Sequence, residues 1–265
     1  MTAGIKANSD GSGAIQVGGT DYVTITSAGV VTMPGPVSIP GNLAVTGSIT
    51  AGAGTPYVFN SYTSPATWTK PTGLKSVKVT VVGAGGTGGG SGPFVGPGPG
   101  QLPSAQGGGG GGGGAAVLVI PAPSITTASV PIAAGPGTST FGPWTPAAPT
   151  TVSATAGSAG GTGTSTPTTT TTGPGGAGGS GSGGALNLPG SAGTAGGALF
   201  TPLGGTGGSA QIFQGLQLVF AGNNTNGTPN SVYGGGGGGA GIRSTTGTST
   251  GGTGGPGIVI VEEFY

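Results

Sequence analysis

Short runs of apolar residues, separated by glycine or proline, recur along the chain. In residues 1–54 apolar and polar side chains alternate within these runs, as at Val23 and Ile25 or Leu43 and Val45. A period of two is the pattern of a half-buried β-strand. The strands predicted in this region are Ala14–Val17, Tyr22–Thr26, Val30–Met33, Val37–Ile39 and Leu43–Thr46.

The strands of residues 1–54 are too short and too few to bury a hydrophobic core within one chain. Three chains could bury their apolar faces together against a common axis, because small sheets need a covering layer to be stable. We therefore expect residues 1–54 to form a trimeric N-terminal β-stalk, so that the protein is a homotrimer. The alternative is a flexible N-terminal leader.

Residues 55–265 form a second predicted region, also built of strands. Lys75–Val82 alternates strictly and places Val77, Val79 and Val81 on one face. No segment has helical periodicity, and each glycine inside a helix would cost about 1 kcal/mol. We therefore expect an all-β, sandwich-like domain with essentially no α-helix. Its other predicted strands are Tyr57–Phe59, Ala66–Thr69, Ala115–Ile120, Ala128–Ile132, Thr151–Thr155, Leu216–Phe220 and Gly257–Val261.

Glycine-rich tracts interrupt these strands, and the chain has 69 glycines in 265 residues. The polyproline-II conformation has three residues per turn and no internal hydrogen bonds, so glycine chains in this conformation can lie side by side and exchange N–H···O bonds. We expect packed polyglycine-II helices; the alternative is flexible linkers. The tracts are Gly83–Gly92, Gly107–Gly114, Gly173–Gly184, Gly190–Gly197, Gly204–Gly208, Gly234–Gly241 and Gly251–Gly257.

The inventory of side chains excludes most catalytic chemistry. The chain has no His and no Cys, five basic and four acidic residues, and a net charge of +1. It therefore lacks an imidazole base, a thiol nucleophile, a disulfide and a soft metal site. Its Ser and Thr hydroxyls have no base to activate them. The basic residues do not cluster, so we expect no nucleic-acid binding, no enzyme activity, no cofactor and no metal.

Two short motifs carry weaker signals. Gly83–Gly88 matches G-x-G-x-x-G after a strand, but the helix and the later acidic residue of a dinucleotide site are missing. Glu262 and Glu263 are adjacent in a strand and would point to opposite faces, which argues against a paired-carboxylate site. We expect them to solubilise the last strand or to meet Lys75 or Lys78 across the sheet.

Four segments carry a resemblance to a known class of protein. Trp68–Gly73, Val77–Gly86, Gly107–Ala115 and Gly257–Tyr265 resemble, in composition and order, the glycine-rich domain at the end of many bacteriophage tail fibres. The resemblance covers roughly residues 55–265 and implies a bundle of polyglycine-II helices whose connecting loops touch a host receptor. Ile39–Thr50 also resembles the stalk repeats of trimeric phage fibres. The chain departs from the pattern by two long insertions rich in Thr and Pro, Pro143–Thr151 and Thr162–Thr172.

The resemblance implies a virion fibre protein that adheres to the host surface. No stretch approaches the roughly 20 apolar residues that span a bilayer, and Met1–Lys6 does not begin like a secretory signal. A phage protein assembled in the host cytoplasm would fit both observations. Its expected partners are other copies of itself, virion tail or fibre proteins bound by its N-terminus, and a host glycan or outer-membrane protein. The alternatives are a structural fibre or decoration protein without receptor binding, and an elastic, silk-like protein.

Aromatic residues in loop-like contexts are the candidates for receptor contact, because they offer flat apolar area. The candidates are Phe94, Phe141, Trp144 and Tyr233. The alternative for each is a place in the sandwich core or in a seam between chains. Trp68, Tyr57 and Phe59 lie within predicted strands, and we expect them in the core.

Overall fold

A computed structural model describes residues 3–17, 20–25, 31–32, 57–92, 105–145, 150–166, 170–197, 204–213, 226–242 and 248–265. The chain forms two compact units, Met1–Thr50 and Ala51–Tyr265. Within the described ranges every named sheet pairing is antiparallel, and the helical structure is one turn of 3-10 helix at Ala122–Ser124. The prediction of an all-β protein with essentially no α-helix is confirmed.

The first unit contains a four-stranded sheet in the order β1-β2-β3-β4. Its strands are β1 (Ala3–Ala7), β2 (Gly13–Val17), β3 (Thr20–Ile25) and β4 (Val31–Thr32). Ile5 pairs with Ile15, which pairs with Val23, so the three side chains form one row. Ile5 is 85% exposed. Sequence analysis missed β1, and the predicted strands at 37–39 and 43–46 lie outside the described residues.

The second unit contains a five-stranded sheet in the order β16-β9-β7-β18-β5, called here the valine sheet. Its strands are β5 (Tyr57–Tyr62), β7 (Ser76–Val82), β9 (Ala115–Pro121), β16 (Leu186–Leu188) and β18 (Ile258–Phe264). β7 pairs along its length with β9 on one side and β18 on the other. The predicted alternation is confirmed, because Val77, Val79 and Val81 are fully buried on one face.

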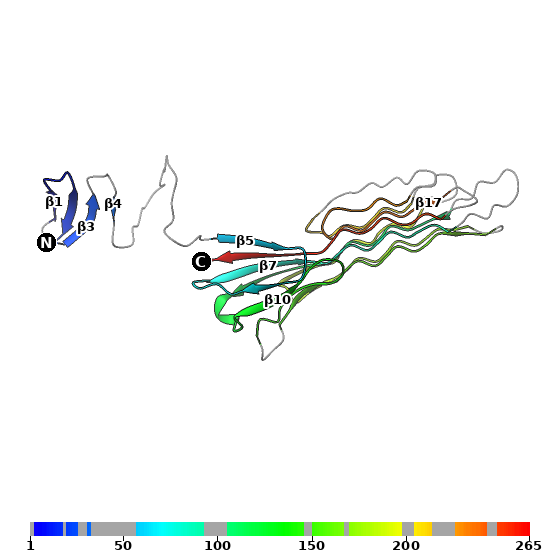
Figure 1. The fold of residues 1–265 in the computed structure, drawn as a ribbon, viewed down its shortest axis with the longest axis horizontal. Coiled ribbons are helices and arrows are strands. Elements are labelled where there is room, and N and C mark those ends of the chain that lie inside the picture. Colours follow the sequence, from blue (N-terminus) through cyan, green and yellow to red (C-terminus); the bar gives the residue numbers. More distant parts are fainter. Residues whose placement is uncertain are drawn as a thin grey trace. The chain divides into compact units, whose positions relative to one another are not determined.

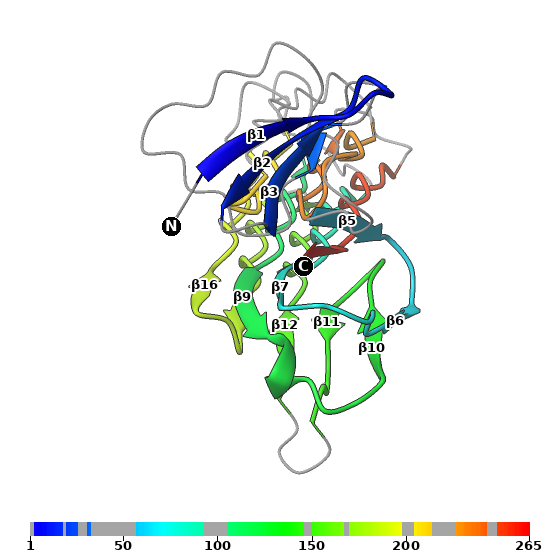
Figure 2. The same ribbon diagram turned by 90° about the vertical axis from the view of Figure 1, so that its left-hand side faces the viewer.

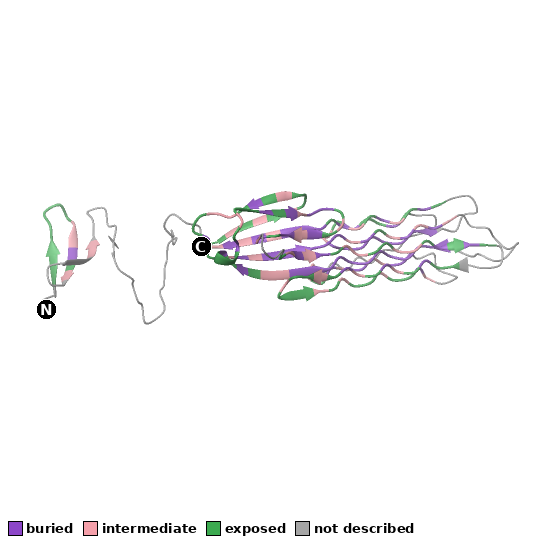
Figure 3. Cartoon of the chain, turned by 90° about the horizontal axis from the view of Figure 1, so that it is seen from below, coloured by how far each residue is buried: buried purple, intermediate pink, exposed green. Residues whose placement is uncertain are grey.

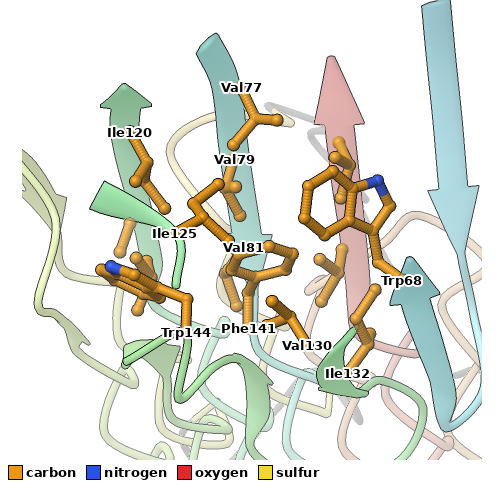
Figure 4. Close-up of a cluster of buried hydrophobic side chains, with 14 of the residues drawn as sticks. Trp68, Val77, Val79, Val81, Ile120, Ile125, Val130, Ile132, Phe141 and Trp144 are labelled. Carbon is orange, nitrogen blue, oxygen red and sulfur yellow. The ribbon is translucent and has the colours of Figure 1, made fainter. Parts of the chain in front are cut away.

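A second five-stranded sheet of this unit has the order β15-β12-β11-β10-β6 and is called here the threonine sheet. Its strands are β6 (Ala66–Thr69), β10 (Ser129–Ala133), β11 (Ser139–Phe141), β12 (Val152–Ala154) and β15 (Gly181–Ser182). The two sheets form separate layers in the end view of the unit (Figure 2). One hydrophobic cluster lies between them, with Trp68, Val79 and Phe141 at its centre (Figure 4).

Glycine-rich tracts continue directly from the strands and extend side by side from one end of the sheets as a bundle, some leading away from a strand and others leading back into one (Figure 1). The central tract, Gly107–Gly114, is wholly buried. Every third residue of this tract donates its N–H to the same neighbour, and the acceptors lie in residues 234–240, 155–161 and 191–194. Its carbonyls accept from residues 83–89, 176–179 and 205–208. Six tracts therefore surround one.

The six outer tracts also bond to one another. Residues 155–161 donate to residues 84–87 and 174–180, and the same exchange continues around the ring until residues 234–240 donate to 86–89. Residues 226–230 and 250–255 lie outside the ring and bond to each other and to residues 234–240. The hydrogen-bonding groups of the extended backbone are thus satisfied between tracts rather than within them.

Short strand pairs stand at the end of the bundle that is remote from the sheets (Figure 1). β8 (Ala105–Gln106) pairs with β17 (Gly241–Ile242), and β13 (Thr164–Ser165) pairs with β14 (Thr170–Thr171). The inserted segment at 162–172 thus contributes a hairpin to this end. The predicted strand at 216–220 lies outside the described residues.

Candidate functional site

The far end of the bundle is the candidate functional site, because chain segments distant in sequence meet there. Isolated bridges join Ser91 to Gly163 and to Ser249, and Gln106 to Thr172. The short pairs β8–β17 and β13–β14 belong to the same end. Residues far apart in the sequence are therefore held together at one end of a hydrogen-bonded scaffold.

Steric exclusion of side chains makes this scaffold possible. A Cβ added at Gly111 would overlap the carbonyl of Ala177, and one added at Gly108 would overlap the carbonyl of Pro174. Each glycine of the central tract meets backbone atoms in the same way, at contacts that real Cβ atoms do not make. The tracts can therefore approach this closely only where glycine faces a neighbour.

Outer tracts follow a rule of three. In residues 173–180 the glycines facing the central tract are buried and those facing the next tract in the ring are half-buried, whereas the remaining position is exposed and carries a side chain. Figure 3 shows buried, intermediate and exposed positions alternating along the tracts. The exposed residues of this tract are Pro174, Ala177 and Ser180. The exposed surface of the ring is thus composed of small, uncharged groups.

The three predicted aromatic contacts that the structure describes do not lie at the far end. Phe141 is fully buried and Trp144 is 6% exposed. Both pack in the sandwich core, where the Phe141 ring lies 5.8 Å from Trp68 and 6.1 Å from Trp144. The prediction of receptor contact is therefore wrong for these two residues, since the facing sheets cover them. Tyr233 is half-buried against Phe213, and Phe94 lies outside the described residues.

Two of the three aromatics expected in the core lie on the surface instead. Tyr57 is 45% exposed and Phe59 is 55% exposed, whereas Trp68 is 2% exposed as predicted. Alternation along β5 explains the outcome, because Val58, Asn60 and Tyr62 take the inward positions. The sequence contains this signal, but the aromatic character of Tyr57 and Phe59 obscured it.

A buried carboxylate joins the first and last strands of the second unit. Glu263 is 5% exposed, and its Oε1 accepts hydrogen bonds from Trp68 Nε1 at 2.7 Å and from Asn60 Nδ2 at 3.0 Å. Its Oε2 accepts a bond from the Tyr265 hydroxyl at 2.8 Å. A buried carboxylate needs such donors, so this network connects β5, β6 and β18. Sequence reasoning did not foresee it.

A second network lies on the opposite face of β18. Lys78 Nζ lies 2.8 Å from Glu262 Oε2, which confirms that the glutamate meets a lysine across the sheet. The Tyr57 hydroxyl donates to Glu262 Oε1 at 2.9 Å. The hydrogen bond from Lys78 lowers the pKa of Glu262, and the bond from Tyr57 acts in the same direction, while burial opposes both. The hydrogen bond to Glu262 raises the pKa of Tyr57.

No protein-family model matches the chain, and no curated protein matches it. The site must therefore be judged on its chemistry. In the part of the chain that the structure describes, no three His, Cys, Asp or Glu side chains gather as a metal site would need, and no helix is long and apolar enough to cross a membrane. Both glutamate networks lie on the sheets, away from the far end of the bundle. Among the residues that the structure describes, the surface at the far end consists of backbone, hydroxyl and small apolar groups.

Proposed function

We propose that this protein is a fibre protein of a phage virion that adheres to the host cell surface through the far end of its glycine bundle. The observation that carries the proposal is the convergence of distant segments at that end of a hydrogen-bonded scaffold, the end remote from the sandwich. Binding residues are commonly placed on irregular segments held by a rigid framework. Host glycans and outer-membrane proteins are partners that uncharged hydroxyl and backbone groups can bind by hydrogen bonds.

We further propose that the tracts are polyglycine-II helices. The threefold rotation of hydrogen-bond partners along Gly107–Gly114 supports this conformation, since polyproline-II geometry has three residues per turn. Hydrogen bonds between the tracts, rather than charged side chains, would keep such a bundle straight and rigid. Interactions at its end would then change little with salt concentration.

The N-terminal unit would form a trimeric stalk that attaches the protein to another virion component. Support comes from the row of Ile5, Ile15 and Val23, whose first two members are exposed. In the described residues of this unit Ala14 is the single buried hydrophobic side chain. A sheet without its own core is stabilised when another layer covers its apolar face.

Adsorption of the full chain to a panel of bacterial strains tests the proposal. We expect binding to at least one strain, and competition with infection by a phage that uses the same receptor. Thr164→Arg at the far end should weaken adsorption about tenfold or more, which corresponds to roughly 1.4 kcal/mol. Thr67→Arg on the exposed face of the threonine sheet is the matched control and should leave it unchanged.

Two results would count against adhesion. Absence of adsorption to every strain, with the protein present in virions, would favour a structural fibre or decoration protein. Equal loss of adsorption in Thr164→Arg and Thr67→Arg would place the binding surface elsewhere.

A further inference from the structure

The second unit carries its exposed large apolar side chains on one face only. Among its described residues these side chains are Tyr57, Phe59, Val119 and Leu186, which are 45%, 55%, 56% and 50% exposed. Residues paired across antiparallel strands share a face. The register places Val119, Lys78, Glu262 and Phe59 in one row across β9, β7, β18 and β5. Leu186 pairs with Val117 in the next row of the same face.

The exposed face of the threonine sheet provides the comparison. Its outward side chains are mostly hydroxyls, namely Thr67, Thr69, Ser129, Thr140, Ser153 and Ser182. One sandwich thus has a polar outer face and an apolar outer face. Exposed large apolar side chains gathered on one face indicate an interaction site, so the outer face of the valine sheet, where they flank the Lys78–Glu262 pair, is the candidate.

Part of this apolar face is already covered by the chain itself. Val82, Ala115 and Ile258 stand at the end of the sheet next to the bundle, and they are buried together with Ala210. Phe213 and Tyr233 pack against the same cluster. The rows further from the bundle have no such cover in the described residues. Among the described residues, the open surface is therefore the continuation of a face that is buried at its end next to the bundle.

The charges of the open face are mutually paired, and their order is self-complementary. Lys78 and Glu262 stand side by side at 2.8 Å in the middle of the row, with Val119 at one end and Phe59 at the other. Reversing the row places apolar on apolar and cation on anion. The face therefore matches a second copy of itself, and it presents no unpaired charge that would require a partner of opposite sign.

We propose that the second units of this chain associate in pairs through the outer face of the valine sheet, about a two-fold axis parallel to its strands, an interface separate from the contact proposed for the N-terminal unit. Such an axis reverses the row, so Val119 of one copy meets Phe59 of the next and Lys78 meets Glu262. An axis along the row would set Lys78 against Lys78, which is repulsive. Packing of two sheets through apolar faces is a standard arrangement in proteins.

This geometry decides how the bundles are presented. A rotation axis parallel to the strands preserves their direction, and the glycine tracts continue from those strands. The bundles of all associated copies therefore point the same way and present their far ends together. That the far ends are binding surfaces rests on the proposed function. The association itself does not depend on adhesion.

Site-specific cross-linking tests the association in the full chain, which has no native cysteine. Two variants, Val119→Cys and Phe59→Cys, are expressed together so that both enter the same assembly. Packed sheets stand about 10 Å apart, beyond the reach of a disulfide, so a short bis-maleimide is used. We expect linked pairs in the co-expressed sample and few in either variant alone, because the row is reversed between copies.

Control variants make the result decisive. Thr67→Cys replaces an exposed residue of the threonine sheet and should give no linked pairs with Phe59→Cys. Adding Val119→Lys to the Phe59→Cys copies, co-expressed with Val119→Cys, should reduce linkage severalfold, because the added charge would be buried.

Wild-type protein that is monomeric by light scattering, or no linkage in the co-expressed sample, would overturn the proposal. If Val119→Cys alone gave as many linked pairs as the co-expressed sample, the reversed arrangement of the row between copies would be overturned. Cell adsorption is measured separately, so its failure is distinguishable from these outcomes.

Discussion

Positions in the bundle differ in how many other tracts surround them. This number determines how much stability is lost when a side chain is added or enlarged there. Gly111 belongs to the central tract, where a Cβ would overlap the carbonyl of Ala177. Ala177 itself is exposed. The two positions hydrogen-bond to neighbouring tracts in the same bundle, so they form a matched pair for mutation.

Gly111→Ala should destabilise the second unit by about 1–3 kcal/mol or more, because surrounding backbone must move to accept the methyl group. Ala177→Ser at the exposed position should change stability by less than about 0.5 kcal/mol. Thermal unfolding followed by circular dichroism measures both. Equal effects of the two substitutions would mean that the tracts are not packed as described.

Acid should weaken the Lys78–Glu262 interaction specifically. The lowered pKa of Glu262 means that the unfolded chain binds its proton more readily than the folded protein does. The stabilisation is therefore complete above the ordinary pKa of 4.5 and is lost as the pH falls below it. Because Lys78 is 41% exposed, the contribution should stay below about 1 kcal/mol.

Comparison of wild type with Glu262→Gln across pH checks this prediction. The difference in unfolding free energy should be constant between pH 6 and 8 and should shrink toward acid. High salt should reduce it as well. A difference that does not depend on pH would show that the side-chain charge of Glu262 is not the stabilising group.

At the scale of elements, the Trp68–Glu263 hydrogen bond connects the edge of one sheet to the interior of the other. Trp68→Phe keeps most of the apolar volume but removes one of the donors to a buried carboxylate. We expect a loss of about 1–3 kcal/mol. In a double-mutant cycle with Glu263→Gln the effects of the two substitutions should be non-additive.

Trp144→Phe is the control, since Trp144 shares the core with Trp68 but donates no bond to Glu263 among the described contacts. Additive effects of Trp68→Phe and Glu263→Gln would contradict direct coupling. Chemical denaturation with a constant slope against denaturant would show that only stability changes.

A strand was predictable from sequence where its alternation of apolar and polar residues reflects one buried face. The burial of single aromatic residues was not predictable from their neighbours in sequence. The period of two along Lys75–Val82 predicted both the strand and its buried face, because alternation reflects burial directly. Phe141 and Trp144 lie beside glycine and proline, a context shared by loops and by short core strands. Their burial depends on the facing sheet, which local sequence does not encode.

Glycine tracts were predictable where glycine is continuous and were missed where it is periodic. Residues 155–161 form part of the ring, yet only their glycines at 157, 160 and 161 are free of side chains. The glycines at 157 and 160 face the central tract, and a Cβ at either would overlap its carbonyls. Glycine at every third residue is therefore the signal of an outer tract, whereas continuous glycine indicates a tract enclosed on all sides.

At the scale of the second unit, strands and tracts are the same continuous segments. β7 leads into Gly83, Gly114 leads into β9, and Gly257 leads into β18. β18 is an interior strand of the valine sheet, between β7 and β5, although it is the last strand of the chain. The sandwich and the bundle therefore share their boundary residues, so we expect disruption of one to destabilise the other.

We accordingly predict that sandwich and bundle unfold as one cooperative unit. Both tryptophans of the chain lie in the sandwich core, so tryptophan fluorescence reports on the sheets alone. Amide hydrogen exchange of Gly107–Gly114 reports on the bundle alone. The two measurements should give the same unfolding free energy, and Gly111→Ala should lower the fluorescence midpoint although its site is remote from both indoles. Fast exchange of the central glycines below the fluorescence transition would instead mean that the bundle opens independently, and the proposed adhesion would lose its rigid scaffold.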